Sequence, residues 1–245
     1  MMNELPLRGK TIMVTGAARR VGRILTLACV RAGADVILHH GHSHQQALDV
    51  QKEIASFGCR SWILAADLSQ ADEVSRLISQ ANQLSPLYAL VNSAAIFESL
   101  SLEQTTLGDW ERHMAINLTA PFLLSQSFAK QLPDDSQGRI VNIVDWRALR
   151  PGADHFPYTV SKAALAAMTQ SLAVALAPRI MVNGLALGAV LPPANEAASE
   201  EIIRNVPAQR WSDAKEVEEA LIFLLAGPAY ITGEIMHVDG GRHLI

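Results

Sequence analysis

The sequence predicts an α/β fold in which one doubly wound parallel sheet of about seven strands carries helices on both faces. Short apolar runs, typical of buried strands, alternate along the 245 residues with stretches that have the pattern of helices. The connections between successive runs are long enough to hold a helix, as parallel strands require. The chain has no internal repeat and no linker-like run, so we expect residues 1–245 to form a single domain.

The strands and helices are expected in a regular order along the chain. The apolar runs expected to form strands cover 11–15, 34–39, 60–65, 87–91, 139–144, 180–187 and 234–238. Helices are expected after the first run to about Ala32, over 45–57 and 71–84, from about Asp109, from within 145–162 to Ala177, and over 214–225. Residues 188–213 are the least regular segment, and we predict that they form a lid over the substrate.

Composition limits the classes of function. Net charge is −4 with acidic and basic residues mixed along the chain, which argues against a nucleic-acid partner. No apolar run approaches the roughly 18 residues of a membrane span, and the N-terminus lacks the pattern of a signal peptide. Cys29 and Cys59 are isolated, as is usual in a reducing compartment. We therefore expect a cytoplasmic protein with a small-molecule substrate and no nucleic-acid or membrane partner.

A glycine-containing turn follows the first predicted strand. Its sequence, GAARRVG, runs from Gly16 to Gly22 and leads into a helix. Backbone N–H groups and the positive end of a helix bind phosphate at such turns. Arg20 stands where a middle glycine would be expected in a dinucleotide-binding turn.

The loop after the second predicted strand favours NADPH over NADH. The loop spans residues 40–44 and has no acidic residue to bind the ribose 2′-hydroxyl of NADH, while Asp35 lies too early in the strand for that role. Arg19 or Arg20, together with His42 and Ser43, could instead bind the 2′-phosphate. The histidines of this loop also suggest a metal site, but nothing elsewhere in the sequence completes a set of ligands, so we predict none.

Three later segments contribute further candidates. Asp67 and Leu68 follow the third strand, where they either contact the adenine or belong to the start of the next helix. Small residues in the segment NSAA would let a flat ligand lie against the backbone, and Phe97 after them is either core or an aromatic wall of the pocket. Asn117 has apolar neighbours and needs hydrogen-bond partners if buried, which predicts a structural bridge that also orders a water.

The stretch from Asp145 to Lys162, DWRALRPGADHFPYTVSK, contains the candidate catalytic residues. Tyr158 and Lys162 are four residues apart and share one face of the expected helix. A nearby ammonium is expected to lower the pKa of the phenol from about 10, which would make Tyr158 a proton donor near neutral pH. Asp145 ends the fifth strand, where open sheets place their ligands. We expect the three side chains to converge; the alternative for Asp145 is a helix cap or a loop salt bridge.

From Lys10 to Gly241 the chain resembles the short-chain dehydrogenase/reductase family. The segments TGAARRVG, NSAA, INLTAPF, YTVSK, VNGLALG and ITGEIMHVDGG occur in the order found in that family. The resemblance implies a Rossmann-type fold and hydride transfer to or from a nicotinamide cofactor. It also implies that Tyr158 is the general acid, that Lys162 binds the nicotinamide ribose, and that Asn117 supports a proton-relay water. A homotetramer formed through the helices that carry Asn117 and Tyr158 is implied too, with the C-terminal tail near a neighbouring pocket.

Two departures from the family pattern resemble its pteridine reductase branch, which includes dihydromonapterin reductases. Asp145 replaces the usual serine, and Arg20 replaces a glycine. In that branch the aspartate pairs with the tyrosine, the arginine reaches cofactor and pterin, and an aromatic residue at the position of Phe97 stacks on the pterin. The resemblance thus implies an NADPH-dependent reductase of a dihydropteridine, dihydromonapterin or dihydrofolate. The alternatives are a carbonyl or 3-oxoacyl-thioester reductase, and a dinucleotide-binding regulator without turnover.

The residues predicted to act at the site fall into three groups. The catalytic group is Asp145, Tyr158, Lys162 and Asn117, and the substrate-binding group is Arg20, Phe97, Asp145 and Tyr158. The cofactor-binding group is Gly16, Arg19, Arg20, Val21, Gly22, His40, His42, Ser43, Asp67, Leu68, Asn92, Ser93, Ala94, Lys162 and Gly188.

Overall fold

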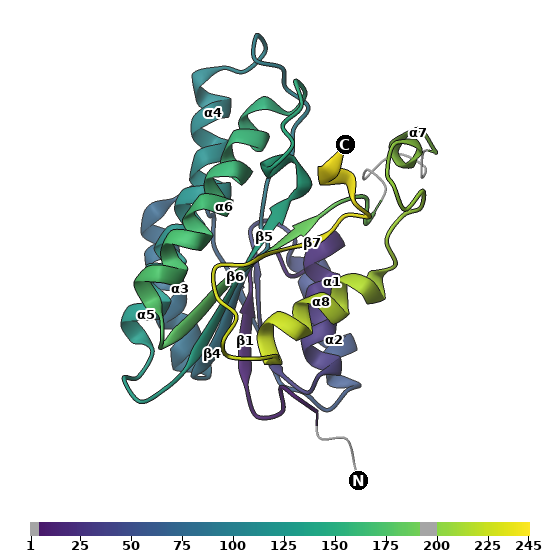
Figure 1. Ribbon diagram of the computed structural model, residues 1–245. Coiled ribbons are helices and arrows are strands. Elements are labelled where there is room, and N and C mark those ends of the chain that lie inside the picture. The colour runs from purple at the N-terminus through teal and green to yellow at the C-terminus, as the bar shows by residue number, and fades with distance from the viewer. Residues whose placement is uncertain (1–4, 192–199) are drawn as a thin grey trace.

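The computed structural model describes residues 5–191 and 200–245, which contain one sheet of seven parallel strands (Figure 1). The order of the strands across the sheet is β3-β2-β1-β4-β5-β6-β7. The fold class is as predicted, and each strand end lies within one residue of its predicted position. The strands are β1 (Thr11–Val14), β2 (Asp35–His40), β3 (Ser61–Ala65), β4 (Leu87–Asn92), β5 (Gly138–Asp145), β6 (Ile180–Leu187) and β7 (Ile235–Val238).

Helices cover both faces of the sheet (Figure 1). On one face lie α1 (Arg20–Arg31), α2 (His44–Ala55) and α8 (Ala214–Ala226). On the other face lie α3 (Ala71–Leu84), α5 (Ala120–Gln131) and α6 (Phe156–Leu176), with α4 (Leu107–Met114) leading into α5. The sheet is therefore the middle of three layers, which explains why its strands are apolar on both sides.

The central strand β1 shows how the sequence builds two cores. Ile12, Met13 and Val14 are all completely buried. Because side chains alternate along a strand, Ile12 and Val14 belong to the core beneath α1 and α8, whereas Met13 belongs to the core beneath α3 and α5. A run of consecutive apolar residues is thus the pattern that a doubly covered strand requires.

The order of the strands creates a crevice beside β1. This strand pairs with β2 on one side and with β4 on the other, so the chain reverses its winding direction there. The loops that leave the carboxyl ends of β1 and β4 consequently turn to opposite faces of the sheet. In open α/β sheets this is the place where ligands bind.

The helix expected from about Asp109 is interrupted around Asn117. Thr106 and Asp109 form a capping box at the start of α4, and residues Ala115–Thr119 form a wider, π-type turn between α4 and α5. Turns of this kind are frequent at functional sites. Propensity alone does not predict the widened turn, because it arises where Asn117 bonds to segments distant in sequence.

Only part of the predicted lid lies within the described residues. Of the segment 188–213, positions 192–199 fall outside them, and α7 (Glu200–Arg204) forms a short helix that we did not predict. Pocket-lining residues on either side of that gap include Leu191, Glu201 and Ile202. The role of the whole segment as a lid stays a prediction.

Among the described helices, α6 alone is long and apolar enough to cross a membrane by length and composition. The expectation that no apolar run approaches that length was therefore wrong for this helix. Its polar residues Tyr158, Ser161 and Lys162 are buried, and it packs against β5 and β6. These contacts make α6 part of the three-layer domain.

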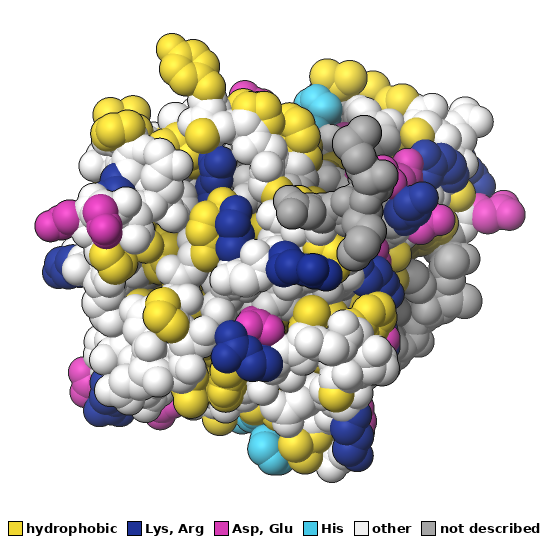
Figure 2. All heavy atoms as spheres, turned by 90° about the horizontal axis from the view of Figure 1, so that it is seen from below, with side chains coloured by type: hydrophobic (Ala, Val, Ile, Leu, Met, Phe, Trp, Pro, Cys, Tyr) yellow, Lys and Arg dark blue, Asp and Glu magenta, His cyan; other side chains and the backbone are white. Residues whose placement is uncertain are grey.

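The face at the amino ends of the strands has mixed charge. Seen from below, Lys and Arg side chains are interspersed there with Asp, Glu and apolar side chains (Figure 2). This distribution agrees with the modest net charge of −4. The face lies opposite the carboxyl ends of the strands, where the ligand crevice is located.

We predict that Phe128→Ala lowers the free energy of unfolding by about 3 to 5 kcal/mol, the usual result of emptying a buried phenyl site. Phe128 on α5 is 1% exposed and packs over Gly138 at the start of β5. The matched control is Phe57→Ala. Because Phe57 is 44% exposed, this substitution should lower the free energy of unfolding much less. Urea unfolding of both variants at one protein concentration measures the difference. Equal losses would contradict the assigned core.

Candidate active site

A cleft of about 890 Å³ opens at the carboxyl ends of the strands. Its walls are the turn after β1, the segment after β4, the end of β5, the first turns of α6 and the loop after β6. Most of the sequence-predicted site residues line it together: Gly16, Arg19, Arg20, Val21, Gly22, Ser43, Ser93, Ala94, Phe97, Asp145, Tyr158, Lys162 and Gly188.

Asp145 has two partners, one for each carboxylate oxygen. Oδ2 accepts a hydrogen bond from Tyr158 Oη at 3.0 Å, and Oδ1 accepts one from the backbone N–H of Arg147 at 2.9 Å. The second bond caps the short 3₁₀ helix Trp146–Ala148. Both readings of Asp145 from the sequence therefore hold, since the residue caps a loop and also pairs with the tyrosine.

Lys162 lies beside this pair but does not lower the pKa of Tyr158 in the structure. Its ammonium donates to the carbonyl of Ile143 at 2.7 Å, and Nζ is 5.7 Å from the centroid of the Tyr158 ring. Burial and the neighbouring Asp145 carboxylate raise the pKa of Tyr158 well above its ordinary value. The expected lowering was wrong, because a carboxylate in direct contact favours the protonated phenol.

Burial also shifts the pKa values of the other two groups. It raises the pKa of Asp145 above its ordinary value, although the hydrogen bonds from Arg147 and Tyr158 oppose the shift. It lowers the pKa of Lys162 to about 8, with Asp145 acting in the opposite direction. Both changes follow from the cost of placing a charge in a poorly solvated site. The cleft thus holds an aspartate and a tyrosine that both retain a proton more strongly than usual.

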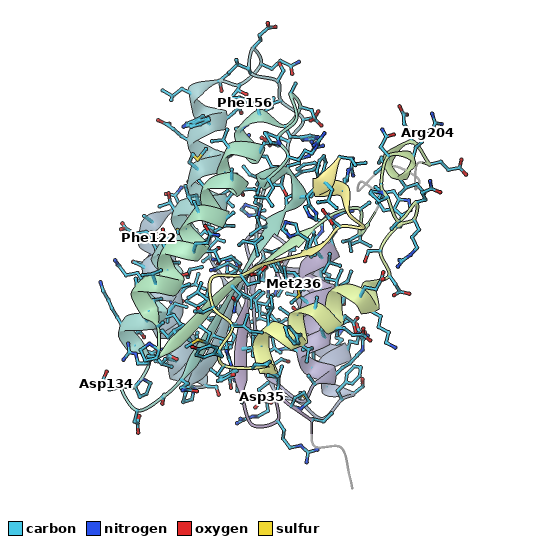
Figure 3. The ribbon with its side chains drawn as sticks, in the orientation of Figure 1. Asp35, Phe122, Asp134, Phe156, Arg204 and Met236 are labelled. Atoms are coloured by element: carbon cyan, nitrogen blue, oxygen red, sulfur yellow. The ribbon has the colours of Figure 1, made fainter. Side chains whose placement is uncertain are left out.

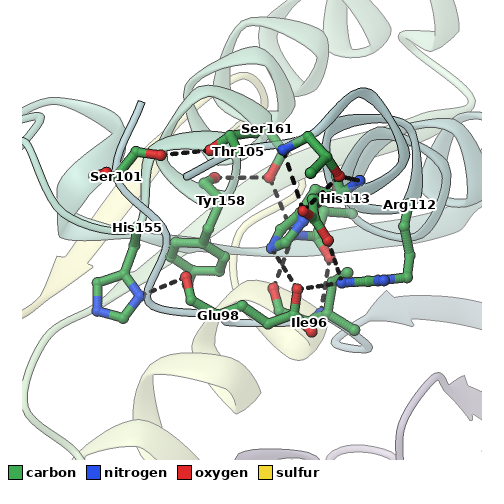
Figure 4. A network of polar contacts seen from close by, with 12 residues as sticks. Ile96, Glu98, Ser101, Thr105, Arg112, His113, His155, Tyr158 and Ser161 are labelled. Carbon is green, nitrogen blue, oxygen red and sulfur yellow. Dashed lines mark hydrogen bonds and ion pairs between the residues drawn. The ribbon is translucent and has the colours of Figure 1, made fainter. Parts of the chain in front are cut away.

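Asn117 connects the segment after β4 to α6 by bonding to Ile96 and Ser161, which are labelled in Figure 4. Its Oδ1 accepts from Ile96 N at 2.9 Å, and its Nδ2 donates to Ile96 O at 3.1 Å and to Ser161 Oγ at 3.0 Å. Ser161 in turn donates to the carbonyl of Tyr158 at 2.7 Å. The predicted structural bridge is confirmed, and its effect is to fix Ile96 relative to Tyr158. A role in ordering a water stays a prediction.

Phe97 forms an exposed aromatic wall of the cleft. Its side chain is 54% exposed, so the alternative of a core residue was wrong. The ring stacks on His155 with centroids 3.9 Å apart and meets the Tyr158 ring edge to face at 4.6 Å. His155 is held by the Glu98 carbonyl at 2.9 Å (Figure 4). A flat ligand could therefore contact Phe97 while its reacting atoms lie near Tyr158.

The turn after β1 fits a phosphate. Gly16 has a positive φ of 65°, and a Cβ on Gly22 would lie 2.0 Å from Gly16 O, so the close approach requires glycine. Helix α1 begins there without a side-chain cap and without an acidic residue in its first turn. The positive end of the helix adjoins the cleft, because Arg19, Arg20 and Val21 line it. Arg20 adopts φ 50°, the left-handed conformation that glycine usually provides.

His39 anchors this turn, although sequence reasoning did not select it. The Gly16 N–H donates to His39 Nδ1 at 3.3 Å, so the other nitrogen carries the proton and donates to Ala66 O at 3.1 Å. Burial lowers the pKa of His39 to about 4, which keeps the ring neutral. The position of His39 near the end of β2 was the indication in the sequence that it could lie near the site. The sequence does not show that its ring points back to the turn at Gly16.

Some predicted cofactor contacts lie outside the cleft lining. His40 is buried and contacts His44, with ring nitrogens 3.3 Å apart. Asp67 accepts from Ser69 N at 2.9 Å, which is the turn role considered as its alternative, and the adjacent Leu68 is buried. The remaining two, His42 and Asn92, also lie outside the lining, and Asn92 Nδ2 donates to Asn142 Oδ1 at 2.8 Å. Cofactor contacts from these residues stay predictions.

Two kinds of site considered from the sequence, an NADH-binding acid and a metal site, can be compared with the structure. Asp35 lies at the amino end of β2, where its carboxylate holds Arg60 at 2.7 Å, far from the cleft (Figure 3). It therefore does not take the position of an NADH-binding acid. Within residues 5–191 and 200–245, no three His, Cys, Asp or Glu side chains gather in a metal-binding arrangement.

Several aromatic and basic residues of the cleft wall, among them Trp146, Arg147 and Arg242, were not selected from the sequence. Trp146 and Arg147 follow Asp145 directly, and Arg242 comes from the tail after β7. Because Trp146 and Arg147 directly follow Asp145 in the sequence, their presence in the cleft wall could have been predicted. Arg242 lines the cleft of its own chain, and the expected approach of the tail to a neighbouring subunit stays a prediction.

Comparisons with known proteins find similar proteins that cover almost the whole chain. Residues 16–243 match the family model described as enoyl-(acyl carrier protein) reductase. The chain is 33% identical to the 3-oxoacyl-[acyl-carrier-protein] reductase of Aquifex aeolicus, covering 97% of this chain and 99% of that protein. It is similar to FolM alternative dihydrofolate reductase 1 from Brucella canis complexed with NADP, with 32% identity, a TM-score of 0.92 and coverage of 98% and 96%. A short-chain dehydrogenase from Burkholderia cenocepacia in complex with NADP gives 31% identity, a TM-score of 0.90 and coverage of 97% and 99%.

We predict at least a tenfold preference in kcat/KM for NADPH over NADH, equivalent to about 1.4 kcal/mol. Arg19→Ala should weaken use of NADPH and leave NADH nearly unaffected, because only NADPH carries the 2′-phosphate. Arg23→Ala is the matched control, since Arg23 pairs with Glu53 and lies outside the cleft lining. Steady-state kinetics with both cofactors test this. Equal efficiency of NADPH and NADH in the wild type would contradict it.

Proposed function

The chain belongs to the short-chain dehydrogenase/reductase family and is an NADP-dependent oxidoreductase, and we propose that it is a pteridine reductase. The observation that carries the proposal is the hydrogen bond of 3.0 Å between Tyr158 and Asp145, at the position where the family usually has serine. The likeness to FolM alternative dihydrofolate reductase 1 from Brucella suis and from Brucella canis supports it. The substrate class is then a dihydropterin, reduced at a C=N bond.

The Asp145–Tyr158 pair suits this reaction. Reduction of C=N adds a hydride to carbon and a proton to nitrogen, and bound NADPH supplies the hydride. Tyr158 Oη provides the proton to the nitrogen, and the carboxyl of Asp145 returns a proton to the phenol. Because burial raises the pKa of Asp145, this carboxyl keeps a proton closer to neutral pH than an ordinary aspartate does. A serine hydroxyl suits the polarisation of a ketone oxygen but is a poor proton reservoir.

Other residues of the cleft bind and orient the reactants. Phe97 stacks on one face of the flat pterin, and Arg20 presents a fork of N–H donors to its carbonyl edge. Lys162, held by the carbonyl of Ile143, binds the nicotinamide ribose. The uncapped start of α1 and the Gly16–Gly22 turn bind the cofactor phosphates.

A second candidate is reduction of a 3-oxoacyl thioester, as in the names of the curated relatives. Relatives from Aquifex aeolicus and Synechocystis cover at least 96% of this chain at 33% and 32% identity. This candidate requires Asp145 to take the place of serine in polarising a ketone. A regulator without turnover is the third possibility, which the complete set of Tyr158, Lys162 and Asn117 disfavours.

The proposal includes assembly and location. A homotetramer built through α5 and α6 would cover Phe122 and Val174, which are 41% and 85% exposed in the single chain. A cytoplasmic location fits an enzyme that depends on NADPH. Both stay predictions.

Asp145→Ala should lower kcat for a dihydropterin by about 10²- to 10⁴-fold, the usual contribution of general acid catalysis. The variant removes the bond to Tyr158 and also the cap on Arg147 N. Melting temperature and kcat must therefore be measured on the same preparations. A purely capping role predicts lower thermal stability with nearly unchanged turnover per folded molecule, and that result would overturn the mechanism.

Two further variants serve as controls for this experiment. Phe97→Ala should mainly raise KM, because stacking binds the substrate and the transition state about equally well. Asp145→Ser restores the usual family residue and should shift preference toward simple ketones or thioesters. A large fall in kcat for Phe97→Ala with unchanged KM would contradict the stacking role.

The pH dependence of kcat should follow the proton on the Asp145–Tyr158 pair. Because the reaction needs the protonated form, kcat should be constant at low pH and should fall as pH rises through the raised pKa of Asp145. Asp145→Asn should lose this fall along with most activity. Initial rates from about pH 5 to about pH 9 measure the profile. A kcat that rises with pH across this range would show that the carboxylate acts as a base instead.

A further inference from the structure

The C-terminal tail places an arginine in the cleft that the proposed reaction does not use. Arg242, in the short 3₁₀ helix Arg242–Leu244, lines the cleft with Trp146 and Arg147. Its guanidinium carbon lies 4.2 Å from the centroid of the Trp146 ring, and that of Arg147 lies 4.8 Å from the same centroid. Two cations therefore flank one indole beside Asp145.

The two arginines differ in what they bind. Arg147 forms a bidentate ion pair with Asp154, with N–O distances of 2.9 and 2.7 Å. Arg242 contacts the Trp146 ring, but its guanidinium makes no hydrogen bond or ion pair within the described part of the chain. Burial and the nearby Arg147 lower the pKa of Arg242 from its ordinary value, yet arginine stays charged in proteins.

The acids that act electrostatically on Arg242 are Asp145, Asp154 and Asp239, and each already has partners; Asp154 is paired with Arg147. Asp145 binds Tyr158 and Arg147, as described above. Asp239 accepts from Gly241 N at 2.9 Å, from His243 N at 2.9 Å and from His243 Nδ1 at 2.7 Å. These bonds fix the tail, so the position of Arg242 is set before a ligand arrives. A fixed, half-buried cation with unused donors suits an anionic group of a ligand.

The Arg242 guanidinium lies over the Trp146 ring, with its carbon 4.2 Å from the ring centroid. A guanidinium stacked on an aromatic face directs its N–H donors outward in its own plane. Two parallel donors at the edge of that plane match the two oxygens of a carboxylate. Because Asp145 and Tyr158 act on the reacting ring, Arg242 is placed to meet the part of the substrate that extends beyond the ring.

We propose that Arg242 binds a carboxylate on the side chain of the substrate, so that the preferred substrate is a dihydropterin with a carboxylate-bearing tail, of the dihydrofolate type. This inference rests on the proposed pteridine reductase function. It distinguishes such substrates from dihydropterins whose side chains carry only hydroxyl groups, such as dihydrobiopterin.

The test compares the two kinds of substrate in wild type and in Arg242→Met. We expect kcat/KM for dihydrofolate to fall by about 10- to 100-fold, mainly through KM, as for loss of a charge-assisted hydrogen bond. For dihydrobiopterin kcat/KM should change by less than about twofold, because it has no carboxylate. Arg242→Lys keeps the positive charge but loses the planar fork of N–H donors, so the fall in kcat/KM for dihydrofolate should be intermediate. Arg150→Met, which removes an exposed arginine outside the cleft lining, should change neither substrate.

Different outcomes separate this inference from the function on which it rests. If the wild type reduces both pterins and Arg242→Met affects them equally or not at all, the carboxylate site is refuted and the pteridine reductase function stands. If the wild type reduces dihydrobiopterin but not dihydrofolate, the carboxylate site is also refuted. If the wild type reduces neither pterin but reduces acetoacetyl-coenzyme A, both proposals fail. Any effect of Arg242→Met would then reflect contacts with the phosphate groups of coenzyme A.

Discussion

The hydrogen bond between Tyr158 Oη and Asp145 Oδ2 is the contact on which the site depends. It joins the end of β5 to the first turn of α6 across 3.0 Å in a largely buried position. Lys162, one turn further along α6, bonds to Ile143 near the end of the same strand. These two bonds hold the helix against the strand, while burial is the largest cause of the pKa shifts of Asp145, Tyr158 and Lys162. The proposed chemistry depends on the pairing of Tyr158 with the carboxyl of Asp145, at a position where the family usually has serine.

The rest of the cleft is built around this contact by segments distant in sequence. Asn117, in the widened turn before α5, bonds to both Ile96 and Ser161, and so places Phe97 beside Tyr158. The turn after β1 is anchored from the opposite side of the crevice by His39. Each anchor uses a buried polar group with its hydrogen bonds satisfied, which favours a cleft that is preorganised before its ligands bind.

The sequence pattern predicts the features that depend on neighbouring residues in the chain, namely the strands, the helices and the spacing of residues along a helix. Buried strands and amphipathic helices are visible in the sequence because burial on both faces demands apolar runs, and the spacing of Tyr158 and Lys162 follows from helical geometry. The direction of the Tyr158 pKa shift, the turn at Asn117, the exposure of Phe97 and the position of Arg242 depend on tertiary contacts. For Tyr158, the sequence contains both Lys162 and Asp145, but only the structure shows that the carboxylate is the closer partner.

The most direct test of the account is NADPH oxidation by the wild-type protein with 7,8-dihydrobiopterin and, separately, with an acetoacetyl thioester. If the Asp145–Tyr158 pair protonates a ring nitrogen, kcat/KM for the dihydropterin should exceed that for the thioester by about 100-fold or more. A thioester reduced more efficiently than the dihydropterin would contradict the account and would assign the same cleft to 3-oxoacyl reduction.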